Sequence, residues 1–575
     1  MLAAIFTRTA PCMKTAAKPI ALLLACSSAI AQMPPDAGAL QREAERALER
    51  QLPANRPNAP LERPMSDGAK AVRVSVKSFS VEGATLIPAA ELEGLLEDLR
   101  GQSLTLAELE SAAQRVARYY RQRGWYVRVY LPVQDVTAGH LRFQVVEGRY
   151  GGVRREQHGQ RTDGVYVESV VTQGLKNGEP LPANVLERGL LLANDLAGVR
   201  ATGILEAGEV PGTSRLLLKI DDLPFLSADL GVSNQGVKST GEWQLVGGVG
   251  LNNLSGRGDR LSLRTLAAEN LSSLTLQYSS PLGGDGWALG LSTSVLDYRL
   301  GERFASLKAQ GSATTAGATL NYAWVRQADR NLRFSLGHEQ RQYADDAMSA
   351  PLRRQNVEAW SYGINGDIRD ALWGGGSSWG ALQLISGRLR IGDIGGERSA
   401  DASGPRSAGS YDKVTLQWNR LQSLGDTGWL LQFGINGQWA DRNLASSERF
   451  SLGGPGGVRA YPVNEGSGDE GLLAKLELQR ELTFGWRGQL FYDYGRVRQH
   501  KREWSGWQGG SAQPNQYHLE GAGIGVSWAG AGDWRFSATY AAPIGSNAGA
   551  GSKGENSDGS ASGNPRLWLS LSAVF

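Results

Sequence analysis

The sequence predicts a transmembrane β-barrel of about 16 antiparallel strands, preceded by an N-terminal helix and two periplasmic α+β domains. From about residue 225 to Phe575, segments of about ten residues alternate apolar and polar side chains. The connections between them alternate between short and long, and the long ones are rich in Gly and Ser. A secretory signal precedes all of these segments. Together these features are typical of a barrel with lipid outside and water in its lumen.

Residues 1–31 have the features of a secretory signal peptide. Lys14 and Lys18 precede the apolar run 20–30, and the small residues at 29–31 form an A-x-A cleavage site. A lipoprotein signal ending at Cys26 is the alternative, but Leu24 fits it poorly. The mature chain is therefore expected to leave the cytoplasm.

The composition excludes several kinds of site. Both cysteines, Cys12 and Cys26, lie in the signal peptide, so the mature chain has no disulfide framework, Cys-ligated zinc or Cys nucleophile. The five histidines are scattered without the spacing of metal ligands. A net charge of +3 on 575 residues argues against a nucleic-acid-binding face. We therefore expect no metal, no cofactor and no nucleic-acid partner.

A short helix on a tether is predicted next. Residues 32–51 carry an apolar stripe of Leu40, Ala44, Ala47 and Leu48 among charged residues. Residues 52–71 are rich in Pro, which makes them an extended and semi-rigid linker. A helix on such a linker can dock far from the domain that follows.

Residues 72–149 and 150–222 each read as an α+β domain. An exposed sheet edge in such a domain can add a strand from an extended client peptide. The alternative is a pair of packing domains without a client. The predicted elements are a strand Val72–Phe79, helices Leu86–Leu99 and Leu106–Arg123 and strands Trp125–Leu131 and Gly139–Val146, then a strand Val165–Val171, a helix Pro182–Leu196 and a strand Arg215–Ile220.

Residues 223–575 are assigned to the barrel. In the segment 486–494, Trp486, Leu490 and Tyr492 lie on one face and Asp493 lies on the other. The last segment, Leu567–Phe575, alternates in the same way. Every backbone group in lipid must be paired, so this strand is expected to close on the first strand, near residues 225–235.

A Gly/Pro-rich loop, Leu452–Pro462, lies between the eleventh and twelfth predicted strands, on the long-loop side. It continues through a further Gly-rich stretch to Gly471. Loops of this length are functional or disordered. The segment 453–457 is not a phosphate-binding loop, because no Gly-Lys-Ser/Thr follows it.

Five short sequence segments resemble those of the TpsB transporters of two-partner secretion. These are the haemolysin secretion/activation proteins of the ShlB/FhaC/HecB type within the POTRA-barrel superfamily. The five segments are Val81–Pro88, Gln122–Tyr126, Leu131–Asp135, Val145–Gly148 and the loop tip, in which Gly453, Gly454, Gly457, Val458, Arg459, Ala460 and Tyr461 match a Val-Arg-Gly-Tyr motif. The resemblance identifies residues 72–149 and 150–222 as POTRA domains. Ala460 replaces the Gly of the motif, which affects the backbone angles allowed there.

The resemblance implies that the loop enters the lumen and that Arg459 pairs with an Asp on the barrel wall. Asp493 is the candidate, because it lies on the lumenal face and belongs with Gly495 to a Phe-x-Asp-x-Gly motif. The alternative is that Arg459 caps an exposed turn. The resemblance also makes Trp568 and Phe575 the candidate closing signal that the barrel-assembly machinery reads.

The expected function is an outer-membrane pore, not an enzyme. It would recognise an unfolded, secreted TpsA-type exoprotein of the haemolysin or adhesin type in the periplasm and translocate it to the cell surface. The helix 32–51 would plug the pore at rest. An assembly insertase of the same superfamily, a passive porin and a TonB-dependent receptor are the alternatives. No G-x-S-x-G or H-E-x-x-H motif supports an enzyme.

Overall fold

The computed structural model describes residues 34–50, 73–210, 212–394, 396–509 and 513–575. The predicted signal peptide (1–31) and the Pro-rich linker (52–71) lie outside these residues. Within the described ranges, no helix has the length and apolar character needed to cross a membrane.

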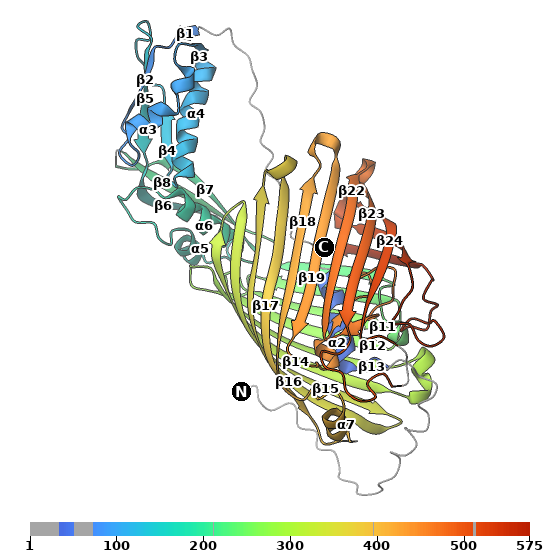
Figure 1. Ribbon diagram of the computed structural model, residues 1–575. Coiled ribbons are helices and arrows are strands. Elements are labelled where there is room, and N and C mark those ends of the chain that lie inside the picture. Colours follow the sequence, from blue (N-terminus) through green and yellow to red (C-terminus); the bar gives the residue numbers. More distant parts are fainter. Residues whose placement is uncertain (1–33, 51–72, 211, 395, 510–512) are drawn as a thin grey trace.

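The C-terminal part of the chain is a closed barrel of sixteen antiparallel strands (Figure 1), as the sequence predicts. The last strand, β26, closes on the first strand, β9, from Ser570 opposite Ser233 to Val574 opposite Asp229. The strands are β9 (Leu226–Ser233), β10 (Gln244–Asn252), β11 (Arg260–Ala268), β12 (Leu271–Leu282), β13 (Trp287–Arg299), β14 (Gln310–Arg326), β15 (Arg330–Ala347), β16 (Ala350–Asp370), β17 (Gly376–Ile391), β18 (Gly409–Ser423), β19 (Trp429–Ala440), β22 (Glu470–Glu481), β23 (Trp486–Arg498), β24 (Gln516–Ala529), β25 (Arg535–Ile544) and β26 (Arg566–Val574).

Side chains on the wall alternate between lipid and lumen. On β23, Leu490 is 52% exposed on the outer face, whereas Asp493 is fully buried on the inner face. Short turns such as η5 (Gly425–Thr427) join the strands at the end that carries the α+β domains. Helix α7 (Glu397–Ser403) lies in a long loop at the opposite end (Figure 1). The two ends thus have the expected periplasmic and extracellular character.

The two α+β domains share one topology. In the first, β2 runs parallel to β5, and β4 pairs antiparallel with β5. In the second, β6, β8 and β7 repeat this arrangement. The first contains β1 (Arg73–Ser75), β2 (Ser78–Glu82), α3 (Ala89–Gly94), η1 (Glu97–Leu99), β3 (Ser103–Thr105), α4 (Leu106–Gln122), β4 (Val127–Tyr130) and β5 (His140–Glu147), and the second contains β6 (Arg149–His158), α5 (Gly164–Val171), α6 (Ala183–Asn194), β7 (Val199–Ala207) and β8 (Thr213–Asp222).

Two sequence predictions in these domains are wrong. Val165–Val171 is not a strand but lies in helix α5, because the Asp163 side chain accepts hydrogen bonds from two backbone N–H groups of its first turn. Burial of Val167, Val170 and Val171 then outweighs the strand preference of valine. The predicted strand Val72–Phe79 is divided, since β1 pairs with β3 and β2 pairs with β5.

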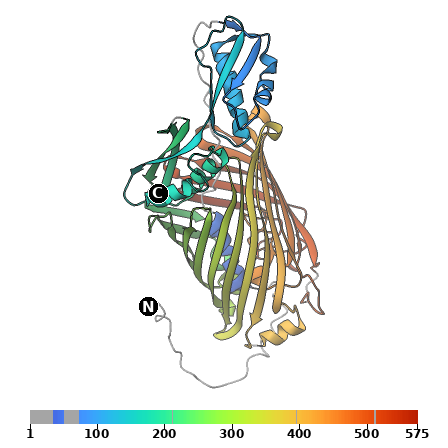
Figure 2. The same ribbon diagram turned by 90° about the vertical axis from the view of Figure 1, so that its left-hand side faces the viewer.

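Helix α2 (Ala37–Arg50) lies inside the barrel, far from the first α+β domain (Figures 1 and 2). Asp36 caps it by accepting a hydrogen bond from the Ala39 N–H at 2.9 Å. Its apolar stripe, which includes Leu40 and Ala44, packs with inward-facing residues of the wall such as Val246 and Leu296 in one buried cluster. The stripe predicted from sequence therefore faces the barrel wall.

Candidate functional site in the barrel lumen

The segment 441–469 joins β19 and β22, the eleventh and twelfth strands around the barrel. It contains η6 (Ser446–Glu448) and a two-residue ladder between β20 (Phe450–Ser451) and β21 (Ser467–Gly468). Leu452, Val458 and Tyr461 are fully buried, in a cluster with the inward-facing Phe491 and Leu519. The loop therefore folds into the lumen and does not extend into solvent.

Glycines permit the tight turn of the loop tip. The Val458 N–H donates to the Leu452 carbonyl at 2.7 Å, and the Gly454 N–H donates to the Tyr461 carbonyl at 3.1 Å. A Cβ on Gly457 would lie 1.8 Å from the Leu452 carbonyl oxygen, which no side chain can accommodate. Gly454 has a φ of +103°, a conformation that favours glycine. The run 453–457 thus lets the chain reverse next to its own backbone.

Arg459 lies at the centre of the site. Its Nε donates to Asp493 Oδ2 at 2.8 Å, and its Nη2 donates to Asp493 Oδ1 at 2.7 Å. Its backbone N–H also donates to Asp493, at 3.0 Å. Glu477 Oε1 lies 2.8 Å from Nη1, and the guanidinium lies 3.5 Å from the centre of the Phe491 ring. The structure therefore brings the two predicted partners together in a bidentate pair and adds a second carboxylate.

The departure from the family motif at Ala460 is accommodated in the fold. Ala460 does not have a positive φ, so its methyl group causes no strain of the kind that requires glycine. The wall provides the room, because a Cβ on Gly521 would lie 2.6 Å from the Ala460 Cβ. Gly495 likewise leaves space for the side chains of Leu452 and Val458. Glycines on the wall thus face side chains of the loop.

The two predicted closing-signal residues lie in different surroundings. Trp568 faces the lumen, is 6% exposed and donates its indole N–H to the Arg459 carbonyl at 2.8 Å. Phe575 is exposed, and its backbone exchanges hydrogen bonds with Ala228 at the start of the barrel. Trp568 therefore connects the last strand to the loop tip as well.

A buried carboxylate fixes the base of the loop to the wall. Glu448 lies 2.7 Å from Arg341 on β15 and 2.9 Å from Lys413 on β18. Burial alone would raise the pKa of Glu448, but Lys413 and Arg341 hold the pKa of this carboxyl well below its usual range. Glu448 is therefore ionised at neutral pH and forms a two-cation clamp.

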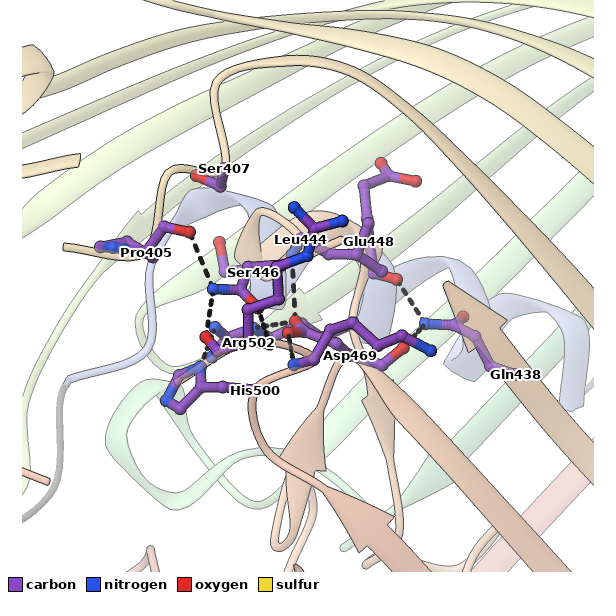
Figure 3. A network of polar contacts seen from close by, with 12 residues as sticks. Pro405, Ser407, Gln438, Leu444, Ser446, Glu448, Asp469, His500 and Arg502 are labelled. Atoms are coloured by element: carbon purple, nitrogen blue, oxygen red, sulfur yellow. Dashed lines mark hydrogen bonds and ion pairs between the residues drawn. The ribbon is translucent and has the colours of Figure 1, made fainter. Parts of the chain in front are cut away.

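Asp469 joins the loop to its neighbours (Figure 3). Its carboxylate accepts hydrogen bonds from the backbone N–H groups of Leu444, at 3.0 Å, and Lys501, at 2.8 Å. Gln438 on β19 donates to the carbonyls of Glu448 and Asp469. Burial raises the pKa of Asp469. This network connects the loop with the extracellular segment 499–515.

Glu465 connects the same loop to the last extracellular loop. It accepts from the Asn547 side chain at 2.6 Å and from the Ser557 backbone N–H at 2.7 Å. Burial raises the pKa of Glu465, and its hydrogen bonds only partly oppose this shift. The loop that carries Arg459 is thus bound to two further extracellular loops.

Helix α2 contacts both the wall and this loop. Asp36 pairs with Arg353 on β16 and accepts from the Ser446 hydroxyl at 2.8 Å. Burial opposes the charge of Asp36, but Arg353 keeps the pKa of this carboxyl below its usual value. Arg42 donates to the carbonyls of Ser446 and Arg449, both at 2.6 Å. The helix and the loop therefore share the η6 segment as a common contact.

Several residues of the site are not predicted from the sequence. Glu477 has the lumenal parity of its strand, which is a signal that could have identified it as a partner of Arg459. Glu448, Glu465 and Asp469 lie in irregular loop segments, where no periodicity reports the direction of a side chain. In the part of the chain that the structure describes, no group of three His, Cys, Asp or Glu residues could hold a metal ion. The site is built to hold polypeptide segments in place.

Comparisons with known proteins agree with this architecture. Residues 212–528 match the family model "Haemolysin secretion/activation protein ShlB/FhaC/HecB", and residues 74–148 match the ShlB-type POTRA domain. The heme/hemopexin transporter protein HuxB of Haemophilus influenzae (strain 86-028NP) is 28% identical over 496 residues, which cover 84% of each protein.

Two further similarities extend the comparison. The outer membrane transporter CdiB of Dickeya dadantii (strain 3937) is 26% identical over 418 residues, which cover 70% of this chain and 72% of that protein. The solved structure of CdiB from Escherichia coli has a TM-score of 0.63 at 21% identity, covering 94% of this chain and 99% of that chain. This structural likeness shows a shared fold.

Proposed function

Because the chain belongs to the haemolysin secretion/activation protein family (ShlB/FhaC/HecB), whose members are outer-membrane transporters of two-partner secretion, we propose that its lumen conducts an unfolded exoprotein from the periplasm to the cell surface. The main support for this proposal is that parts of the chain itself lie inside the lumen. Two separate segments lie inside the barrel: α2 (Figure 2) and the loop tip, each of which packs against inward-facing residues of the wall.

In this proposal, α2 is the resting plug and leaves before the client passes. The helix is covalently connected to the barrel only through residues on its C-terminal side, and its own sequence is rich in charged residues that tolerate water. The loop tip stays in place, because the ion pair of Arg459 with the fully buried Asp493 is directional. The passage would then open on one side of a fixed loop.

The α+β domains are proposed to capture the client. In each three-stranded sheet, the order leaves β4 and β7 at an edge, where a client strand can add through backbone hydrogen bonds. Tyr130 on β4 and Leu205 on β7 are exposed and provide apolar contacts beside these edges. The first domain matches the POTRA family model, and we interpret residues 150–222, with the same topology, as a second POTRA domain.

The client is proposed to be a secreted TpsA-type exoprotein. One relative is described as a heme/hemopexin transporter, so a protein of heme or hemopexin acquisition joins the haemolysin and adhesin types as a candidate. The aromatic residues of the last strand, Trp568 and Phe575, are proposed to guide insertion by the barrel-assembly machinery. Outer-membrane lipid would surround the apolar face of the wall.

The test is secretion of a TpsA-type client that is produced together with this protein, measured in the culture medium. Arg459→Ala is expected to abolish secretion while the barrel remains inserted and heat-modifiable in electrophoresis. Arg480→Ala is the control, because Arg480 lies on the outer face of β22 beside Trp429. Normal secretion by the Arg459→Ala variant would remove the loop from the mechanism.

Capture is tested separately with a photo-crosslinking amino acid. Placed at Tyr130 or Leu205, it is expected to join the transporter to the N-terminal part of the client. Placed at Glu110, an exposed position on α4, it is expected to give no adduct. Equal crosslinking from all three positions would contradict capture at the sheet edges.

A further inference from the structure

The outer wall carries two aromatic levels that mark the boundaries of the membrane. Trp429 and Trp439 lie ten positions apart on β19 and both face outward with the apolar side chains of this strand. At about 3.4 Å per residue and a tilt of about 40°, ten positions span roughly 26 Å across the membrane. This agrees with an apolar band of about 25 Å between aromatic girdles. Trp439 therefore lies at the extracellular boundary.

Arg496 lies at the same level. It is ten positions from Trp486, the first residue of β23, and it is opposite the outward-facing Leu472 in the barrel register. On the outer face of β23, Leu490, Tyr492, Tyr494 and Arg496 follow one another toward the extracellular side, so the surface changes from aliphatic to aromatic to cationic. This is the order of a lipid's chains and headgroup.

A groove of about 320 Å³ opens on the outer wall at this point. Trp439 and Leu472 provide its apolar side, and Arg496, Arg498, Gln516 and the carboxylate of Glu470 provide its polar side. We propose that this groove binds a phosphorylated lipid of the outer leaflet, with its phosphate on Arg496 and Arg498 and its chains along the apolar wall below Leu472. The volume suits a headgroup, and the chains would extend down the wall.

The charges in the groove favour an anion. Arg496 donates to the amide oxygen of Gln516 at 2.8 Å and forms no ion pair with a carboxylate among the described residues. Arg498 and Lys501 share one carboxylate, that of Glu470, at 3.3 Å and 2.5 Å. Two arginines and one carboxylate thus line the groove, and Lys501 beside it balances part of the charge of that carboxylate. A planar guanidinium matches a phosphate in bidentate geometry.

Another outward-facing arginine provides a matched contrast. Arg390, near the extracellular end of β17, is exposed but already lies 3.7 Å from Glu358 on the neighbouring strand. Its charge is therefore balanced within the wall. A general attraction of surface arginines to an anionic membrane would act at both Arg496 and Arg390, whereas a built site acts at Arg496 and not at Arg390.

The experiment uses the purified full-length protein in detergent micelles, with bound lipid counted by native mass spectrometry. Bisphosphorylated lipid A is the probe, and the same lipid without phosphates is its control. Arg496→Gln is expected to lower the affinity for the phosphorylated lipid about tenfold, the size of one charge-assisted hydrogen bond. Arg390→Gln is expected to leave it unchanged.

Three results would overturn the proposal. The first is that the Arg496→Gln variant binds the phosphorylated lipid as tightly as the wild type. The second is that the wild type binds the dephosphorylated lipid as tightly as the phosphorylated one. The third is that inorganic pyrophosphate displaces the lipid at equal concentration, which would mean that the groove binds anions in general. Trp439→Ser tests the apolar side of the groove independently of its polar side. It should weaken lipid binding and leave pyrophosphate binding unchanged. Electrophoretic heat-modifiability verifies that each variant is folded.

Discussion

The loop tip and helix α2 occupy the same lumen but are held by different forces. The tip is fixed by Arg459, whose largely buried guanidinium meets two carboxylates and an aromatic ring. The helix is held by an apolar stripe together with separate polar contacts of Asp36, Ala37, Gln41 and Arg42, only one of which is an ion pair to the wall. Buried ion pairs require one geometry, whereas apolar contacts are non-directional. The comparison indicates a fixed loop beside a removable helix.

The largest effect is expected for Arg459→Ala. It leaves Asp493 fully buried without its cation, a change that costs about 3–5 kcal/mol. The loop tip should leave its position and become sensitive to proteases added outside the cell. The double variant Arg459→Ala/Asp493→Ala should recover part of the loss, because it removes the unpaired charge. A protease-resistant loop in the single variant would contradict the fixed-loop model.

Glu448→Gln should have the next largest effect. It should lower the free energy of unfolding by about 3 kcal/mol, because it leaves Lys413 and Arg341 facing an amide. The pKa of Glu448 is lowered on folding, so its stabilisation is complete above its usual pKa of 4.5 and is lost as the pH falls toward the lower folded value. Thermal unfolding of the wild type should therefore show an acid-dependent loss below about pH 4.5 that the variant lacks. An identical pH profile in both proteins would exclude this clamp.

Leu40→Ala tests the helix side of the comparison. Leu40 is 1% exposed in the stripe, and its truncation should weaken docking of α2 by about 2 kcal/mol. In planar bilayers, the variant should spend more time in a high-conductance state, while secretion continues. Glu49→Ala on the exposed part of the helix is the control. Unchanged conductance would mean that α2 does not plug the pore.

The smallest effect is expected for Trp568→Phe. It removes the indole N–H that bonds the Arg459 carbonyl and keeps most of the aromatic bulk, so the cost should be about 1 kcal/mol. Protease protection of the loop should fall slightly and insertion should be normal. A failure of insertion would instead assign Trp568 to the assembly signal.

Much of the fold could be predicted from residue patterns. The alternation in the segments after residue 225, the closure of β26 on β9 and the apolar stripe of α2 are all present in the structure. The error at Val165–Val171 came from a run of β-branched residues that an Asp cap and one-sided burial converted to helix. Local preference was overruled there by packing.

The candidate site was only partly predictable. The pairing of Arg459 with Asp493 could be predicted from the sequence. A loop motif indicated Arg459, and a strand motif together with the alternation of its strand indicated Asp493. The clamp of Glu448 and the loop contacts of Glu465 and Asp469 could not, since they join irregular segments to distant strands. The positions of such segments depend on how the whole barrel closes.

The sequence by itself determined which face of each strand meets lipid. Lipid acts as a solvent for that face, so the polarity of the side chains alone decides which face turns outward. The sequence also determined the number and order of the strands. Only the tertiary structure decided which charges meet inside the barrel, such as Arg459 with Glu477 and Asp36 with Arg353. An ion pair needs two particular atoms within a few ångströms, and curvature and register of the closed wall set that distance.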